Sequence, residues 1–394
     1  MTLEIYHQLG HNYKWNLDSI NEDQTGQGVI FGPRYILPGD LQQIDINVKN
    51  ESFLDPQFYL PDQPLGNLGE YTFFPHTIAG GFESSDYLDS ANQSAEQCVN
   101  FQHENGFRFM LIPTRYSLGM PTNFIESQQE LFVSPFIQAI ENSANDKSVI
   151  LQLVLNDTMI KDAEYSTDLL NWITGIQGID GVYLITQNQP RQKQIDDIDF
   201  LFAYLKFIDS LRNNSLKVFL GYLNTEAIVL SVADPNIVTM GSYENMRMFN
   251  VENFRIKEKK DQRGPNARLY ISKLLQWVDS DYNGAIQMSQ SEGVGFFDQN
   301  KYQAEMFLPS FKWHFTKPEL YKHHFLVFSN QLNAISQHNS EERFGYVSDL
   351  IENAIGNHQQ LKNKGVVFDN LSGGAHLPKW LTALNLFAHF KGWA

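Results

Sequence analysis

The chain has 394 residues, of which 42% are hydrophobic, 13% aromatic and 19% charged, so it is able to bury a large core. This composition excludes a disordered or collagen-like chain, and the single cysteine, Cys98, excludes a disulfide scaffold. The formal net charge of -16 opposes a general polyanion-binding surface, although a local basic patch is compatible with it.

The N-terminal residues lack a basic segment followed by an apolar core, and the sequence contains no apolar run of about 18 residues. We therefore expect no membrane-spanning segment. A single cysteine suits a reducing compartment, and a cytoplasmic location is the default prediction.

Short apolar runs alternate with longer amphipathic stretches, which is typical of parallel strands connected by helices. One late run, Gly365 to Phe368, is a candidate for an eighth strand. The other predicted strands are Val29 to Ile36, Ser52 to Leu60, Phe107 to Pro113, Val149 to Leu155, Gly181 to Thr186, Lys217 to Leu223 and Asn236 to Met240.

Helical patterns with recognisable ends lie between these runs. Gly106 is expected to stop the first of them, and Thr167 and Thr225 are candidate N-caps for two others. The predicted helices are Asp89 to Asn105, Asp168 to Ile176, Gln194 to Leu211 and Glu226 to Ala233, followed by a helical region from Pro318 to Gln360.

This order of elements favours a (β/α)₈ TIM-like barrel over an open doubly wound sheet, which is the alternative. We expect the barrel domain to span residues 1–285. Residues 286–394 are expected to form a mainly helical C-terminal region, because strand-like runs become rare after about Tyr282.

The sequence has no GxxxxGK[ST] phosphate loop, no GxGxxG after a strand, no HExxH and no GxSxG elbow, which disfavours several common enzyme classes. Because the carboxyl ends of the strands form the site in TIM barrels, the polar residues at those ends are the candidates. They are Asp55, Gln57, Arg115, Asn156, Asp157, Gln187, Asn188, Tyr222, Asn224, Ser242, Tyr243 and Glu244.

Three of these candidates are carboxylates. Two facing carboxylates can divide the work of protonating a leaving group and stabilising an electron-poor sugar carbon, so Asp55, Asp157 and Glu244 are candidate catalytic residues. Each also has a structural alternative: Asp55 and Asp157 suit turns, and Glu244 suits the start of a helix.

The strand ends resemble the tRNA-guanine transglycosylase superfamily. The segments that carry the resemblance are Asp55-Pro56-Gln57-Phe58-Tyr59, Asn156-Asp157, Thr186-Gln187-Asn188, Gly221-Tyr222-Leu223 and Gly241-Ser242-Tyr243-Glu244. The resemblance implies a proton-transfer role for Asp55, a base-edge contact for Gln187 and a place near the nucleophile for Glu244.

The chain also departs from that family. Asn188 and Gln189 stand where the family has a glycine pair, and its nucleophilic Asp has no Asp counterpart here. The family's structural zinc site needs several cysteines, whereas this chain has one, so no metal or other cofactor is expected.

A basic cluster between Arg255 and Arg268 stands out in this acidic chain. Lys257, Lys259, Lys260 and Arg263 are expected to bind phosphate groups near the site, and Arg115 is a candidate anion clamp. The alternatives are a solvated loop for the cluster and a structural ion pair for Arg115.

The sequence therefore predicts a glycosyl-bond transferase or hydrolase acting on a nucleoside-type substrate, with a nucleotide or nucleic acid as the expected partner. Asp55, Glu244 and Asp157 are its catalytic candidates, and Gln187, Tyr222, Arg115 and Asn156 are candidates for substrate binding. The alternatives are a sugar glycoside hydrolase and a non-catalytic barrel that binds a protein partner or a second copy of itself.

Overall fold

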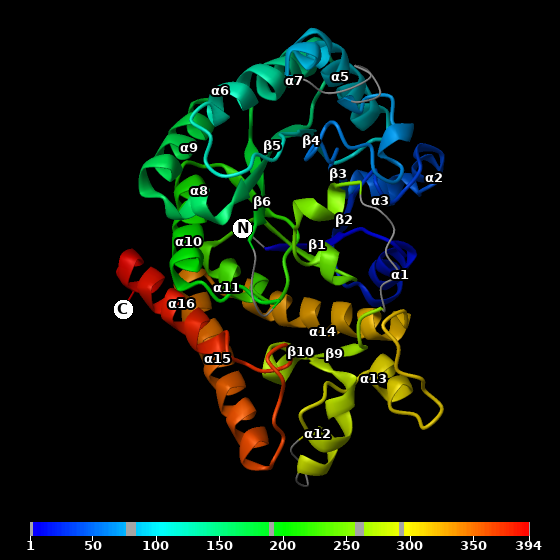
Figure 1. Ribbon diagram of the computed structural model, residues 1–394, viewed down its shortest axis with the longest axis vertical. Helices are drawn as coiled ribbons and strands as arrows, with labels where there is room; N and C mark the ends of the chain where they lie inside the picture. Colours follow the sequence, from blue (N-terminus) through cyan, green and yellow to red (C-terminus); the bar gives the residue numbers. More distant parts are fainter. Residues whose placement is uncertain (1–2, 76–83, 189–192, 257–263, 291–294, 394) are drawn as a thin grey trace.

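The structure is a computed structural model that describes residues 3–75, 84–188, 193–256, 264–290 and 295–393. Eight parallel strands form a nearly closed TIM-like barrel with helices between them, and a mainly helical C-terminal region follows (Figure 1). The barrel strands are β1 Glu4–Gln8, β2 Gly28–Phe31, β3 Phe53–Leu54, β4 Phe109–Ile112, β5 Ser148–Asn156, β6 Gly181–Gln187, β7 Lys217–Leu220 and β8 Ile237–Gly241.

The strands are ordered β3-β2-β1-β8-β7-β6-β5-β4, and each neighbouring pair is parallel. The two ends of the sheet, β3 and β4, come together without pairing as strands, and just before them the amide of Arg108 donates a hydrogen bond of 2.8 Å to the carbonyl of Ser52. The predicted barrel is therefore confirmed, and all eight carboxyl ends of the strands lie at one end of it.

The eighth strand is not the predicted one. It is β1, near the N-terminus. Tyr6 and Gln8 of this strand point into the barrel. His7 is buried on the outer side, where its ring lies within hydrogen-bonding distance of the hydroxyl of Thr25, at 3.0 Å. Two polar residues in a row hide this strand from a search for apolar runs. Residues 365–368 form no strand, and Val367 is 72% exposed.

The helices follow the predicted pattern with shifted starts. Gly106, at φ +73, ends the helix of residues 84–104 as expected. Asp162, not Thr167, caps α9, because the helix begins earlier than predicted. The helices of the barrel are α1 Lys14–Asp23, α2 Pro38–Gln42, α3 Ile46–Asn50, α5 Ser84–Glu104, α6 Phe124–Gln128, α7 Ser134–Asn142, α8 Asp157–Lys161, α9 Ala163–Gly175, α10 Ile198–Asn213 and α11 Ala227–Leu230.

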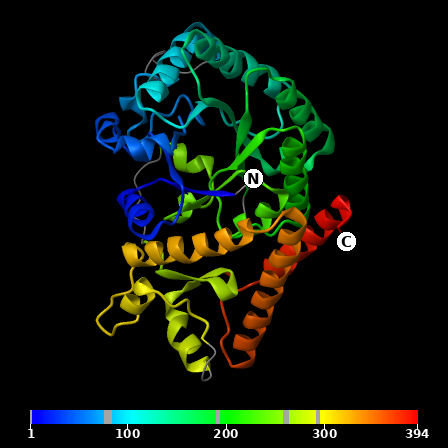
Figure 2. The same cartoon turned by 180° about the vertical axis from the view of Figure 1, so that it is seen from behind.

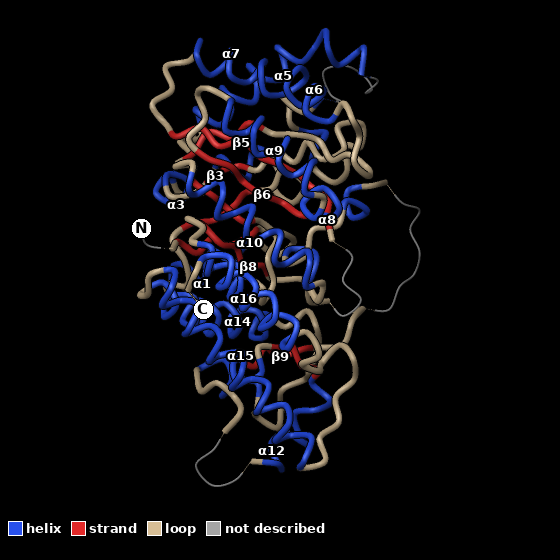
Figure 3. Tube along the Cα trace, turned by 90° about the vertical axis from the view of Figure 1, so that its left-hand side faces the viewer, coloured by secondary structure: helices blue, strands red, loops and turns tan. Residues whose placement is uncertain are grey.

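After the barrel strands, the chain forms a two-stranded antiparallel sheet of β9 Arg268–Ile271 and β10 Gln276–Asp279, which Figure 3 shows apart from the barrel strands. The helices that follow are α12 Asn283–Ser289, α13 Lys301–Met306, α14 Pro318–Ser336, α15 Ser340–Asn363 and α16 Leu377–Lys391. The helical character predicted for residues 318–360 is thus confirmed, whereas the domain boundary at 285 stays a prediction.

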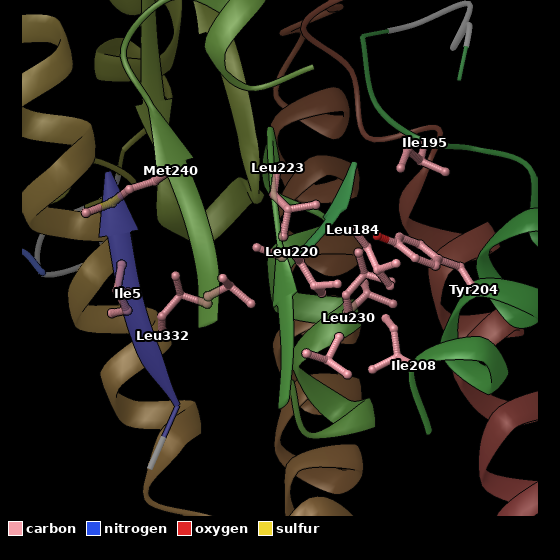
Figure 4. Packing of buried hydrophobic residues seen from close by; sticks show 14 of the residues in the cluster. Ile5, Leu184, Ile195, Tyr204, Ile208, Leu220, Leu223, Leu230, Met240 and Leu332 are labelled. Carbon is pink, nitrogen blue, oxygen red and sulfur yellow. The ribbon is translucent and has the colours of Figure 1, made fainter. Parts of the chain in front are cut away.

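Helix α14 runs along the barrel, as both Figure 1 and Figure 2 show. In Figure 4 its residue Leu332 lies beside Ile5 of β1, and Tyr204 and Ile208 of α10 pack near Leu184 of β6. These buried side chains belong to one continuous core between the sheet and its surrounding helices. The packing fixes the strands and, with them, the residues at their carboxyl ends.

Polar contacts attach the last two helices to the barrel. The guanidinium of Arg343 on α15 is 2% exposed and lies 2.9 Å from the carboxylate of Asp234. The indole of Trp380 on α16 donates a hydrogen bond of 2.6 Å to the carbonyl of Ile195. Such buried contacts indicate that α15 and α16 are integral to the packing around the barrel.

Candidate functional site

The interior of the barrel is filled by side chains. The ring of Phe53 lies 5.5 Å from that of Tyr183 and 5.8 Å from that of Phe219, and all three are buried. At the amino end, Arg108 forms a 2.5 Å ion pair with Glu4. A filled interior is expected for an eight-stranded barrel, so a site has to lie at the carboxyl end.

Asp55 lies at that end, directly after β3, and it is fully buried. Its carboxylate accepts hydrogen bonds from the side-chain amide of Gln152 at 2.6 Å, from the backbone amide of Gln57 at 3.0 Å and from the hydroxyl of Tyr59. These donors come from β5 and from the loop after β3. The arrangement fixes both carboxylate oxygens.

Burial raises the pKa of Asp55 to about 6, although the hydrogen bonds from Tyr59, Gln152 and Gln57 act in the opposite direction. A carboxyl group with this pKa exchanges its proton near neutral pH, which is what a general acid or base requires. Perturbed pKa values of this kind cluster at functional sites. Asp55 is therefore the strongest catalytic candidate among the predicted residues.

Tyr222 joins this network from the loop after β7. Its hydroxyl accepts a hydrogen bond of 3.3 Å from the side chain of Gln57, and the hydroxyl of Tyr59 lies at the same distance. Gln57 and Tyr222 have φ angles of +59 and +54, a region that bulky side chains rarely adopt. Strained residues of this kind point to a functional constraint on the two loops.

The segment after β8 covers the network. The ring of Phe249 lies 4.9 Å from that of Tyr59, and the ring of Phe254 lies 4.7 Å from it. Val251 lies between these two aromatic residues in the sequence, and its amide donates a 2.7 Å hydrogen bond to the side chain of Gln187. Asp55 consequently lies beneath an aromatic cover formed by residues 249–254.

Two predicted catalytic residues lie apart from Asp55. Glu244 begins a short 3₁₀ helix after β8 and forms a 2.5 Å ion pair with Lys193. Asp157 is the first residue of α8 and pairs with Lys161 at 3.1 Å. Within the described residues, no hydrogen bond or ion pair joins Asp55 to either of them.

The predicted binding residues lie at the expected end of the barrel, where most make structural contacts. Asn156 caps α8 by accepting from the amide of Met159 at 3.0 Å, and Gln187 holds the aromatic cover. Arg115 donates to the hydroxyl of Ser127 at 3.1 Å, and burial lowers its pKa. Tyr222 is the binding candidate that directly contacts the Asp55 network.

The basic cluster is described only at its ends. Lys257, Lys259, Lys260 and Arg263 lie outside the described residues. Arg255, just before them, pairs with Glu252 at 2.7 Å, a local contact between two exposed side chains.

Neither a metal site nor a membrane span emerges from the described ranges. No group of three or more His, Cys, Asp or Glu residues there is arranged to hold a metal ion. None of the described helices is both long and apolar enough to cross a bilayer.

Sequence reasoning missed two buried charged residues at this end of the barrel, Glu226 and Arg247. Burial raises the pKa of Glu226 to about 7 and lowers the pKa of Arg247 to about 10. They line a pocket that also includes Tyr222. Glu226 lies near a strand end in the sequence, but it was assigned to a helix and so was not considered as a site residue. Arg247 was not considered because it lies beyond the residues at the strand end.

No protein-family model and no curated protein match it. Among solved structures, it is similar to xylanase B from Clostridium stercorarium F9, with 9% sequence identity and a TM-score of 0.33, over 63% of this chain and 89% of that one. A TM-score this low carries no inference about the activity of this chain.

Proposed function

We propose that the chain is an enzyme that transfers or hydrolyses a glycosyl bond, with Asp55 as the proton-transferring carboxyl group. The observation that carries this proposal is the buried Asp55 carboxyl, held by Gln152 and Tyr59 at the carboxyl end of the barrel, with a pKa of about 6. A carboxyl group of this kind can protonate a leaving group and later accept the proton back.

The aromatic side chains above Asp55 favour a nucleoside-type substrate. Tyr59, Tyr222, Phe249 and Phe254 form a cluster of buried rings, and aromatic rings provide stacking surfaces for planar bases. The resemblance of the strand ends to the tRNA-guanine transglycosylase superfamily supports the same choice. Since Phe249 and Phe254 cover Tyr59, the proposal requires these two rings to move when substrate binds.

Glu244 is the second carboxylate of the proposed mechanism. Its partner Lys193 lines the pocket that includes Tyr222, so Glu244 lies at the rim of the same end of the barrel. In the proposed reaction, Asp55 protonates the leaving group while Glu244 stabilises or attacks the electron-poor sugar carbon.

A non-catalytic interaction barrel is the second candidate, and the closed mouth favours it. The pocket beside Tyr222 has a cavity volume of about 10 Å³, which is about the space that one water molecule needs. In this alternative, Asp55 stabilises the loops after β3 and β7 and has no substrate. Binding of nucleic acid, a protein partner or a second copy, like the cytoplasmic location, stays a prediction.

Release of free base from ribonucleosides and of p-nitrophenol from p-nitrophenyl glycosides tests the proposal. We expect turnover by the wild type and a loss of about 100-fold or more in Asp55→Asn, the range for a general acid. Asp199→Asn, on the exposed side of α10, is the matched control and should retain activity. Equal turnover by Asp55→Asn and wild type would exclude Asp55 as the proton donor.

A further inference from the structure

A groove on the outside of the barrel lies between α7 and α9, which belong to successive crossovers of the sheet (Figure 1). Its cavity volume is 670 Å³. Sites for small molecules commonly have about 300–1,000 Å³. None of the described residues that line the groove takes part in the hydrogen-bond network of Asp55. The groove is therefore a second place, apart from the carboxyl end of the strands, where a ligand has room to bind.

Trp172 of α9 lines this groove as a half-buried side chain. Its indole N–H donates a hydrogen bond of 2.8 Å to the side-chain oxygen of Gln129. The side-chain nitrogen of Gln129 in turn donates to the hydroxyl of Ser134 at 2.9 Å. These two bonds hold the indole in one orientation, so a ligand that packs on it loses little free energy in ordering this side chain.

The backbone at Gln129 is unusual. Residues Gln129–Val133 form a π-helical turn between α6 and α7. Such turns are rare, and they frequently occur at functional sites. Because this turn carries the side chain that fixes Trp172, it indicates a function for the groove independently of the cavity itself.

The polar side chains of the groove include two amides and a carboxylate that are available to a ligand. Gln138 and Glu141 line it from α7, and Asn171 lines it from α9. These three side chains are exposed, and within the described part of the chain they make no hydrogen bond or ion pair. Amide groups both donate and accept hydrogen bonds, and a carboxylate accepts them, so the set suits hydroxyl groups.

The charge and the apolar residues of the groove restrict the class of ligand. Among the described residues that line it, Glu141 alone is charged, so a phosphate or carboxylate group would meet no cation. The large apolar residues Ile137, Trp172 and Ile176 are each half-buried, which is unlike the exposed apolar patch of a protein-docking surface. A neutral ligand with an apolar face and several hydroxyl groups fits both observations.

We propose that this groove binds, without cleaving it, a neutral chain of pyranose rings with equatorial hydroxyl groups, of the β-linked glucose type. A pyranose ring with only equatorial hydroxyl groups presents C–H bonds on both faces, and such a face packs well on a flat aromatic ring. Trp172 provides that ring, and Gln138, Asn171 and Glu141 bind the hydroxyl groups at the edge of the sugar. The inference goes beyond the proposed function, because binding here involves no proton transfer.

The test is an NMR titration of the ¹⁵N-labelled protein with cellotetraose, a chain of β-linked glucose rings. The sequence has six tryptophans, and Trp172→Phe identifies the indole N–H signal of Trp172 by its loss. We expect this signal to shift saturably, with a dissociation constant on the order of 1 mM, as for an open site with few hydrogen bonds. Sorbitol, an acyclic polyol without a flat face, is the matched ligand. It should leave the signal in place at an equal concentration of hydroxyl groups.

Two variants test the residues, with affinities measured on the signals of cellotetraose by saturation transfer. Trp172→Ala removes the aromatic ring and should weaken binding at least about tenfold. Asn171→Ala removes one exposed amide and should weaken binding about threefold, the net value of a hydrogen bond. Trp313→Ala, at a half-buried tryptophan outside the groove, and Asn353→Ala, on the exposed side of α15, are the matched controls and should bind like the wild type. Thermal melts of all variants verify folding.

The outcomes separate this inference from the proposed function. The sugar groove is overturned if cellotetraose leaves the Trp172 signal unchanged, or if Trp172→Ala, Asn171→Ala and wild type bind it equally. Self-association of the wild type that Trp172→Ala abolishes, without sugar binding, would assign the groove to a second copy of the chain instead. Asp55→Asn should bind cellotetraose like the wild type, because Asp55 lies outside the groove. Sugar binding without any turnover would overturn the catalytic role of Asp55 and leave the groove standing.

Discussion

Gln57 and Tyr222 follow different strands, yet they meet at a 3.3 Å hydrogen bond while each holds a left-handed backbone conformation. The side chain of Gln57 also accepts a 3.0 Å hydrogen bond from the amide of Arg34, after β2. The loops after β2, β3 and β7 are therefore connected through one glutamine. This connection positions the aromatic hydroxyls that surround Asp55.

Substitution of Gln57 tests how much strain this backbone stores. Gln57→Ala should lose about 1–3 kcal/mol of unfolding free energy, because the amide of Arg34 loses its partner. Gln57→Gly should be about 1 kcal/mol more stable than Gln57→Ala, since glycine adopts positive φ without a steric penalty. Urea denaturation measures both.

The control position is Gln359, which is exposed within α15. The order should reverse there, because glycine in a helix is about 1 kcal/mol less favourable than alanine. A Gly variant at position 57 that is less stable than the Ala variant would contradict the assignment of strain to this loop.

The pKa of Asp55 predicts how stability depends on pH. Burial raises that pKa from its ordinary value of 3.8 to about 6. The folded state then binds more protons than the unfolded state between these values, so the contribution of Asp55 to stability falls as pH rises through about 6. The full difference is on the order of 3 kcal/mol for a fully buried carboxyl group.

Asp55→Asn removes this titration. Unfolding free energies measured in urea from pH 5 to pH 7.5 should show the wild type losing stability relative to the variant, by roughly half of that difference. A constant gap between the two proteins across the range would show that Asp55 has the same protonation behaviour folded and unfolded.

The sequence predicted the barrel because most strands are continuous apolar runs with parallel neighbours on both sides. It missed β1 because His7 and Gln8 are polar residues whose buried partners, Thr25 and Tyr183, lie far along the chain. It assigned residues 365–368 to a strand from composition alone. A strand also needs a partner edge, and these residues follow α15 outside the sheet.

The candidate site was predictable to the extent that it depends on strand ends. Asp55 follows β3 directly and Tyr222 comes shortly after the end of β7, so their place at one end of the barrel followed from topology. The pairing of Glu244 with Lys193 could not be predicted in this way, because Lys193 lies on another loop. Arg247 was equally hidden, since only the fold shows that Trp277 stacks on it.

The ion pair between Arg343 and Asp234 should contribute more to stability than a surface pair. Arg343 is 2% exposed, and Asp234→Asn would leave its charge poorly compensated. Asn tolerates the positive φ of +58 at this position, so the substitution removes the charge without straining the backbone. It also removes the weaker pair that Asp234 forms with Arg212 at 3.4 Å. We expect Asp234→Asn to lower the free energy of unfolding, measured by urea denaturation, by about 2–4 kcal/mol.

Asp157→Asn provides the comparison, because it breaks a partly exposed pair with Lys161 on α8. The decrease in the free energy of unfolding of Asp157→Asn should be below about 1 kcal/mol. Equal losses in Asp234→Asn and Asp157→Asn would mean that burial adds nothing to the pair that holds α15 against the barrel.

The hydroxyl of Tyr59 should control the protonation of Asp55. Its hydrogen bond favours the carboxylate form, so Tyr59→Phe should move the pKa of Asp55 above about 6. Titration of ¹³C-labelled aspartate carboxyl groups by NMR measures the change, and Asp55→Asn identifies the signal. Tyr6→Phe is the control, because the hydroxyl of Tyr6 binds Arg108 at the opposite end of the barrel, at 2.8 Å. A pKa of Asp55 that stays the same or falls in Tyr59→Phe would show that this hydroxyl does not stabilise the carboxylate.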